Sequence, residues 1–109
     1  MSSTEISQLQ LLQQNLQTIS MQRQQFESQL VELDSALSEL NKSPQAYKVV
    51  GRIMIASSAE ELKKSLVEEK EITQLRINNL LKQEESIQKT MEDKRERALA
   101  ELKKNKKEE

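Results

Sequence analysis

A short apolar segment, residues 47–56, interrupts a chain that otherwise has a polar composition and helical periodicity. Its sequence, Tyr-Lys-Val-Val-Gly-Arg-Ile-Met-Ile-Ala, is rich in β-branched residues and contains the only glycine of the protein. β-Branched residues favour strands. A glycine at the first position of a two-residue loop suits a type II′ turn, because that position needs a positive φ. The segment therefore predicts a β-hairpin over 46–56, with strands at about 46–50 and 53–56 joined by Gly51 and Arg52.

Both faces of this predicted hairpin are largely apolar. Side chains alternate between the two faces along a strand. One face would carry Lys48, Val50, Ile53 and Ile55, and the other Tyr47, Val49, Met54 and Ala56. A lone hairpin of this kind is marginally stable in water and prone to associate, so we expect it to join the protein to other subunits. The residues expected at these contacts are Tyr47, Val49, Val50, Gly51, Ile53, Met54 and Ile55.

The segments on either side of the hairpin have the periodicity of coiled-coil helices. Apolar residues recur at alternating steps of three and four, the pattern of a coiled-coil seam. In the first segment these residues are Leu9, Leu12, Leu16, Ile19, Phe26, Leu30, Leu33, Leu37 and Leu40. In the second they are Ile77, Leu80, Ile87, Met91 and Ala98, with Glu84 and Lys94 at two seam positions. Helices are predicted over 5–42 and 58–102, followed by a charged, solvated tail at 103–109.

A long helix with an apolar stripe needs a partner, and the nearest partner is in the same chain. Folding the chain back at the hairpin aligns the apolar residues of both helices. The aligned pairs are Leu40 with Leu62, Leu37 with Leu66, Phe26 with Ile77, and Leu16 with Ile87. This alignment favours an antiparallel intrachain pair over a parallel dimer. The predicted fold is mostly α: one domain over residues 1–109, with a coiled-coil pair of long helices and a short β-hairpin between them.

Arg23 interrupts the first seam and would lie near Glu84 in this alignment. Two interpretations remain open at this point. Arg23 could extend past its apolar neighbours to reach water. Alternatively, it could form a polar layer with Glu84 that fixes the register of the two helices, as polar residues at core positions of coiled coils do.

Composition argues against catalysis and against metal binding. The 109 residues include no Cys and no His, so we expect no thiolate chemistry, no zinc ligation and no enzyme activity. Nor is there a glycine-rich phosphate loop, and no cofactor is expected. The net charge of −1 is distributed unevenly, with a net charge of −3 over residues 1–42 and a balance of charges over residues 58–109. Neither half has the character of a nucleic-acid surface. No signal peptide or membrane span is visible, and a cytoplasmic location is expected.

The order of these elements resembles a known family. A helix, the segment Tyr-Lys-Val-Val-Gly-Arg-Ile-Met-Ile at residues 47–55, and a second helix with Leu-Leu-Lys-Gln-Glu-Glu at residues 80–85 resemble a β-class prefoldin subunit. The resemblance covers nearly the whole chain. It implies a hexamer of two α-class and four β-class subunits, with strands forming a double β-barrel platform that carries six coiled coils. The short connection between Leu40 and Tyr47 favours the archaeal type over the eukaryotic one.

The resemblance also implies a function: an ATP-independent holdase that captures unfolded polypeptides at the coiled-coil tips and passes them to a group II chaperonin. The tip would lie where the chain ends meet. The expected client-binding residues are Ile6, Leu9, Leu11, Leu12, Leu99 and Leu102. Singly, each could be an incidental exposed side chain; together, they would form an exposed apolar patch suited to unfolded chains. The alternative function is that of a structural or tethering coiled-coil protein, oligomerised through its hairpin.

Overall fold

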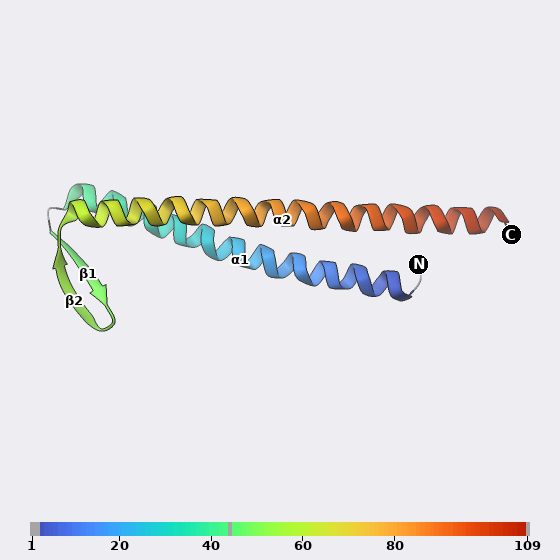
Figure 1. Ribbon diagram of the computed structural model, residues 1–109, viewed down its shortest axis with the longest axis horizontal. Helices are drawn as coiled ribbons and strands as arrows, with labels where there is room; N and C mark the ends of the chain where they lie inside the picture. The colour runs from blue at the N-terminus through green and yellow to red at the C-terminus, as the bar shows by residue number, and fades with distance from the viewer. Residues whose placement is uncertain (1–2, 44, 109) are drawn as a thin grey trace. The chain divides into compact units, whose positions relative to one another are not determined.

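The computed structural model describes residues 3–43 and 45–108, of which residues 105–108 are described by their backbone alone (Figure 1). The elements are α1 (Ser3–Lys42), β1 (Ala46–Val50), β2 (Ile53–Ser57) and α2 (Ala59–Glu108). The predicted fold, two long helices with an antiparallel β-hairpin between them, is confirmed.

The chain divides into two compact units. Unit 1 holds the residues up to Arg23 and those from Asn79 on, and unit 2 holds Gln24–Asn78. In each unit a segment of α1 lies beside a segment of α2 and runs in the opposite direction (Figure 1). Unit 2 also contains the β-hairpin.

The hairpin has the predicted register and turn. β1 and β2 pair antiparallel, with Val50 opposite Ile53 and Ala46 opposite Ser57. Gly51 has a φ of 62°, and it is the only described residue with a positive φ, so the φ of Arg52 is not positive. A type II′ turn needs this combination, whereas a type I′ turn needs positive φ at both central residues. Two residues therefore reverse the chain without disturbing the strand pairing.

Serine residues mark the ends of the helices nearest the hairpin. At the end of α1, the backbone N–H of Ser43 still donates to the carbonyl oxygen of Glu39, at 3.1 Å, but Ser43 precedes a proline, which disfavours helical geometry. At the start of α2, the hydroxyl of Ser58 accepts a hydrogen bond from the backbone N–H of Glu61, at 3.4 Å. Ser58 is therefore the N-cap of α2.

The end of α2 differs from the prediction. The sequence pattern predicted fraying after residue 102 and a solvated tail at 103–109, but α2 continues to Glu108. The segment after residue 102 contains only Lys, Asn and Glu. Lys and Glu are good helix formers, and no glycine or proline is present to stop the helix. The high charge of this segment was therefore not a sufficient reason to predict that the helix ends at residue 102. Residue 109 lies outside the described part of the chain.

The seam between the helices follows the predicted heptads and extends further than predicted. Ile77, Leu80, Met91 and Ala98 are buried on α2. Thr73 is buried too, at 6% exposure, although before residue 77 the prediction placed only Leu62 and Leu66 against the first helix. The seam residues of α1 are half-buried, and none of α1 is fully buried. In the described helices, no stretch is both long and apolar enough to cross a membrane.

Candidate functional site

The hairpin exposes nearly all of its apolar side chains. Tyr47, Val49, Val50, Ile53, Met54 and Ile55 are each between 51% and 67% exposed. The register places Val49 opposite Met54 and Val50 opposite Ile53, so large apolar side chains cover both faces of the sheet. Single exposed apolar residues are common on protein surfaces, but a contiguous patch of them marks an interaction site. Every residue predicted for oligomerisation is therefore available for contact with another chain.

A groove lies where the hairpin meets the two helices of unit 2. It has a volume of about 440 Å³ and is mostly apolar. Its apolar lining includes Leu40 of α1, Leu62 and Leu66 of α2, and Tyr47 and Val49 of β1. The sequence analysis missed this groove, because it forms only where three separate elements come together.

The predicted tip residues lie on both helices of unit 1. Ile6, Leu11, Leu99 and Leu102 are between 43% and 59% exposed, whereas Leu9 and Leu12 are half-buried because they belong to the seam. The ammonium group of Lys94 donates a hydrogen bond to Oε1 of Gln8, at 2.9 Å, so α1 and α2 are adjacent here. The grouping of the six predicted residues into one client-binding tip stays a prediction.

Arg23 and Glu84 form an ion pair at seam positions of unit 1. Nε of Arg23 lies 2.7 Å from Oε1 of Glu84, and the side chains are 20% and 13% exposed. Of the two interpretations of Arg23, contact with Glu84 in a polar layer is the one observed. Its effect on helix register stays a prediction.

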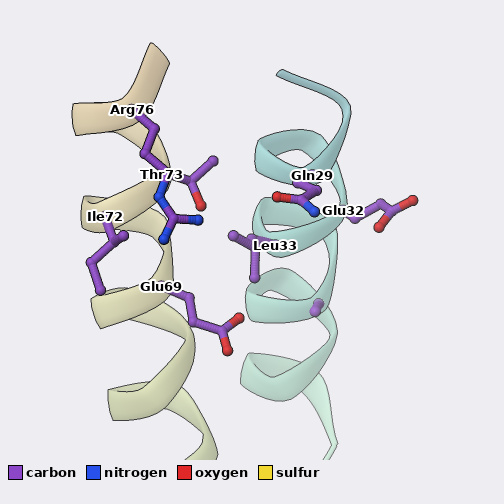
Figure 2. Close-up of a pocket in the computed structure, with 8 residues that line it drawn as sticks. Gln29, Glu32, Leu33, Glu69, Ile72, Thr73 and Arg76 are labelled. Carbon is purple, nitrogen blue, oxygen red and sulfur yellow. The ribbon is translucent and has the colours of Figure 1, made fainter. Parts of the chain in front are cut away.

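A second groove of unit 2 runs between the helices beside Thr73 (Figure 2). Gln29 and Leu33 point into it from α1, and Glu69 and Thr73 point into it from α2; Glu32, Ile72 and Arg76 also line it (Figure 2). The Arg76 guanidinium also lies 5.5 Å from the centre of the Phe26 ring, close enough for a cation–π interaction. Thr73, a short residue at a seam position, and Ala36 both line this groove. Within the described residues, no cluster of acidic, His or Cys side chains could hold a metal ion.

Comparisons with known proteins agree on one family. Residues 3–107 match the family model described as "Prefoldin subunit". The chain is 35% identical over 92 residues to the prefoldin subunit beta of Caldivirga maquilingensis, covering 82% of this chain and 76% of that protein. It is 41% identical over 85 residues to the prefoldin subunit beta of Archaeoglobus fulgidus, covering 75% and 73%.

A solved structure shows the same fold. The crystal structure of the prefoldin beta subunit from Thermococcus strain KS-1 matches with a TM-score of 0.85 at 26% identity, covering 91% of this chain and 90% of that one. The family match spans nearly the whole chain, so the two helices and the hairpin are all included in it. The chain therefore belongs to the prefoldin family, as a β-class subunit of the archaeal type.

Proposed function

We propose that this chain is one subunit of an ATP-independent holdase, which captures unfolded polypeptides and delivers them to a group II chaperonin. Membership of the prefoldin family makes it a chaperone subunit rather than a member of an enzyme class. The observation that carries the proposal is the exposure of apolar side chains on both faces of the hairpin. A chain with this surface requires partners that cover it.

The proposed partners are an α-class prefoldin subunit and further β-class copies, in a hexamer of two α-class and four β-class chains. A two-stranded sheet leaves one edge of each strand unpaired. Pairing of these edges between subunits would satisfy the free backbone groups, and closure into a β-barrel would leave no edge exposed. The same closure would bury one apolar face of each hairpin inside the barrel. The two-stranded sheet and its exposed faces support this assembly.

The proposed client-binding surface is the tip of unit 1, formed by Ile6, Leu9, Leu11, Leu12, Leu99 and Leu102. Four of these side chains are exposed on helices that are adjacent there. Apolar contacts have no directional requirement, so such a surface accepts many unfolded sequences. Several tips held on one platform would bind a single client together, and effective concentration would strengthen the weak individual contacts. The proposal includes a cytoplasmic location and needs no cofactor.

Co-expression tests the assembly directly. The chain is produced with the α-class prefoldin subunit of the same organism, and the molar mass of the complex is measured by multi-angle light scattering. A species with two α-class and four β-class chains is expected. A monomer or dimer that ignores the α-class chain would contradict the proposed platform.

The purified complex is then mixed, without nucleotide, with a client that aggregates on dilution from denaturant. Suppression of light scattering is expected at a stoichiometric ratio of complex to client. A complex of the right mass that leaves aggregation unchanged would favour the alternative function, a structural or tethering coiled-coil protein.

A further inference from the structure

Met54 is the most exposed large apolar residue of the hairpin. It lies in β2 opposite Val49 and is 67% exposed. The chain offers two internal comparisons: Met21 of α1 is similarly exposed, at 64%, whereas Met91 lies in the seam at 4%. Oxidants attack thioether sulfur atoms that they can reach. Among these three methionines, Met54 and Met21 are therefore open to oxidation in the free chain, and Met91 is protected.

The face that carries Met54 is the one best suited to pack against a neighbouring subunit. Tyr47, Val49 and Ala56 share this face, and it carries no charged residue. The opposite face carries the ammonium group of Lys48. Tyr47 and Val49 also line the groove at the base of the hairpin, together with Leu40 and Leu62 and with the charged residues Glu39, Lys48 and Glu69. A neighbour that covers this face would bury Met54.

We propose that Met54 is an oxidation site that controls assembly, so that a free chain oxidised at this residue does not enter the complex. The inference rests on the proposed function, because it requires the hairpin to be the assembly surface. The oxidant is a peroxide. The sulfur attacks one peroxide oxygen, the O–O bond breaks, and the other oxygen leaves as water; sulfur is oxidised by two electrons and the peroxide is reduced. Sulfoxide is polar, and burying it without hydrogen bonds is unfavourable.

Assembly and oxidation compete for the same side chain. In the free chain the sulfur is accessible, and in the complex the neighbouring subunit would cover it. Oxidation therefore acts on subunits that have not yet found partners. Because methionine sulfoxide reductases restore the thioether, the block is reversible.

The test oxidises the free chain with hydrogen peroxide, removes the peroxide, and then adds the untreated α-class subunit. Peptide mass mapping locates the added oxygen, and light scattering measures the complex. We expect oxygen on Met54 and Met21 but not on Met91, and a loss of complex in proportion to the oxidised fraction of Met54. Methionine sulfoxide reductases for both epimers should restore assembly.

Matched variants separate Met54 from the other methionines. Met54→Leu should keep full assembly after the same treatment, since leucine has a similar volume and no thioether. Met21→Leu should lose assembly as the unaltered chain does. In the Met21→Leu chain, the oxidised fraction of Met54 can be compared directly with the amount of complex that forms. This comparison tests the inference even where Met54→Leu assembles poorly before treatment.

Two results would overturn the inference: normal assembly of a chain oxidised at Met54, or equal loss of assembly after peroxide in Met54→Leu. Failure of the untreated chain to assemble with the α-class subunit would instead overturn the proposed function, and this inference with it. The untreated control therefore distinguishes the two failures.

Discussion

The Arg23–Glu84 ion pair lies at seam positions, most of which hold apolar residues elsewhere in the helices. Both side chains are mostly buried and the two groups are 2.7 Å apart. A buried ion pair adds little net stability relative to apolar residues of similar volume, but removing one partner leaves a charge unpaired in the core. We expect this polar pair also to disfavour other registers of the two helices, because a shift would separate the charges.

Arg23→Leu should therefore destabilise the chain, by about 1–3 kcal/mol, because Glu84 loses its partner. The double variant Arg23→Leu with Glu84→Leu should recover this loss or exceed the original stability, since both seam positions become apolar. Urea unfolding followed by circular dichroism measures both effects. If Arg23→Leu leaves stability, helix pairing and assembly unchanged, the polar-layer interpretation is wrong.

Thr73 is a short seam residue that lines a groove between the helices of unit 2. Thr73→Leu should stabilise the chain by about 0.5–2 kcal/mol, because the longer apolar side chain fills space that is now open. Thr73→Ala provides the matched control and should lower stability. Thermal unfolding of the three chains compares them under one condition. A destabilised Thr73→Leu chain would mean that the site cannot accept the larger side chain without strain.

Polar seam residues explain where prediction from the sequence stopped. Phe26 and Ile77 have large apolar side chains. The seam could therefore be predicted from residue type wherever such residues recur at the heptad spacing. Thr73 and Lys70 also continue the heptad but carry no apolar signal, and Lys70 pairs with Asp34 at 2.7 Å. The seam therefore looked interrupted before residue 77, although the helices stay paired there. Burial by a neighbouring helix is a tertiary effect that residue type alone does not encode.

The β-hairpin is the element whose geometry depends most on a single residue. A Cβ at Gly51 would meet nothing within 4 Å, so the requirement for glycine comes from its positive φ and not from lack of space. The elements that flank the turn were predictable because alternation, turn chemistry and the serine caps all agree with one another. The groove at the hairpin base was not predictable from the sequence, since it depends on how the hairpin is placed against the two helices.

Gly51→Ala should destabilise the turn by about 1–2 kcal/mol, because an L-residue at positive φ is strained. Arg52→Ala is the matched control and should be nearly neutral, since Arg52 lacks a positive φ. The concentration of α-class subunit needed for half-maximal assembly measures both variants. Equal effects of the two substitutions would contradict a strained turn at Gly51.

At the scale of the whole molecule, the proposed function assigns assembly to unit 2 and client binding to unit 1. Substitution of the four exposed tip residues tests this assignment, because these residues lie outside the seam. Replacing Ile6, Leu11, Leu99 and Leu102 with Ser should weaken protection of an aggregating client several-fold, because the apolar contacts are lost. The complex itself should keep its mass. Light scattering of the client, without nucleotide, measures protection.

A control variant for this experiment comes from unit 2. Val31 and Leu75 are as exposed as the tip residues, at 65% and 62%, but belong to the other unit. Replacing both with Ser removes exposed apolar surface of the same kind and should leave protection unchanged. If the control variant weakens protection of the client as much as the tip variant does, client binding does not depend on the tip. Full protection by the tip variant would lead to the same conclusion.

The antiparallel seam has a consequence for how such a chain can change in length during evolution. Seam residues of both helices are buried or half-buried, so the two helices are not independent of one another. Insertion of seven residues into α1 preserves the pairing only if α2 gains seven at the matching place, which would lengthen the pair by about 10 Å. An insertion in only one helix would leave part of the apolar stripe of that helix exposed to water. Under the proposed function, the length of the helix pair that carries the client-binding tip would therefore change in paired steps of one heptad.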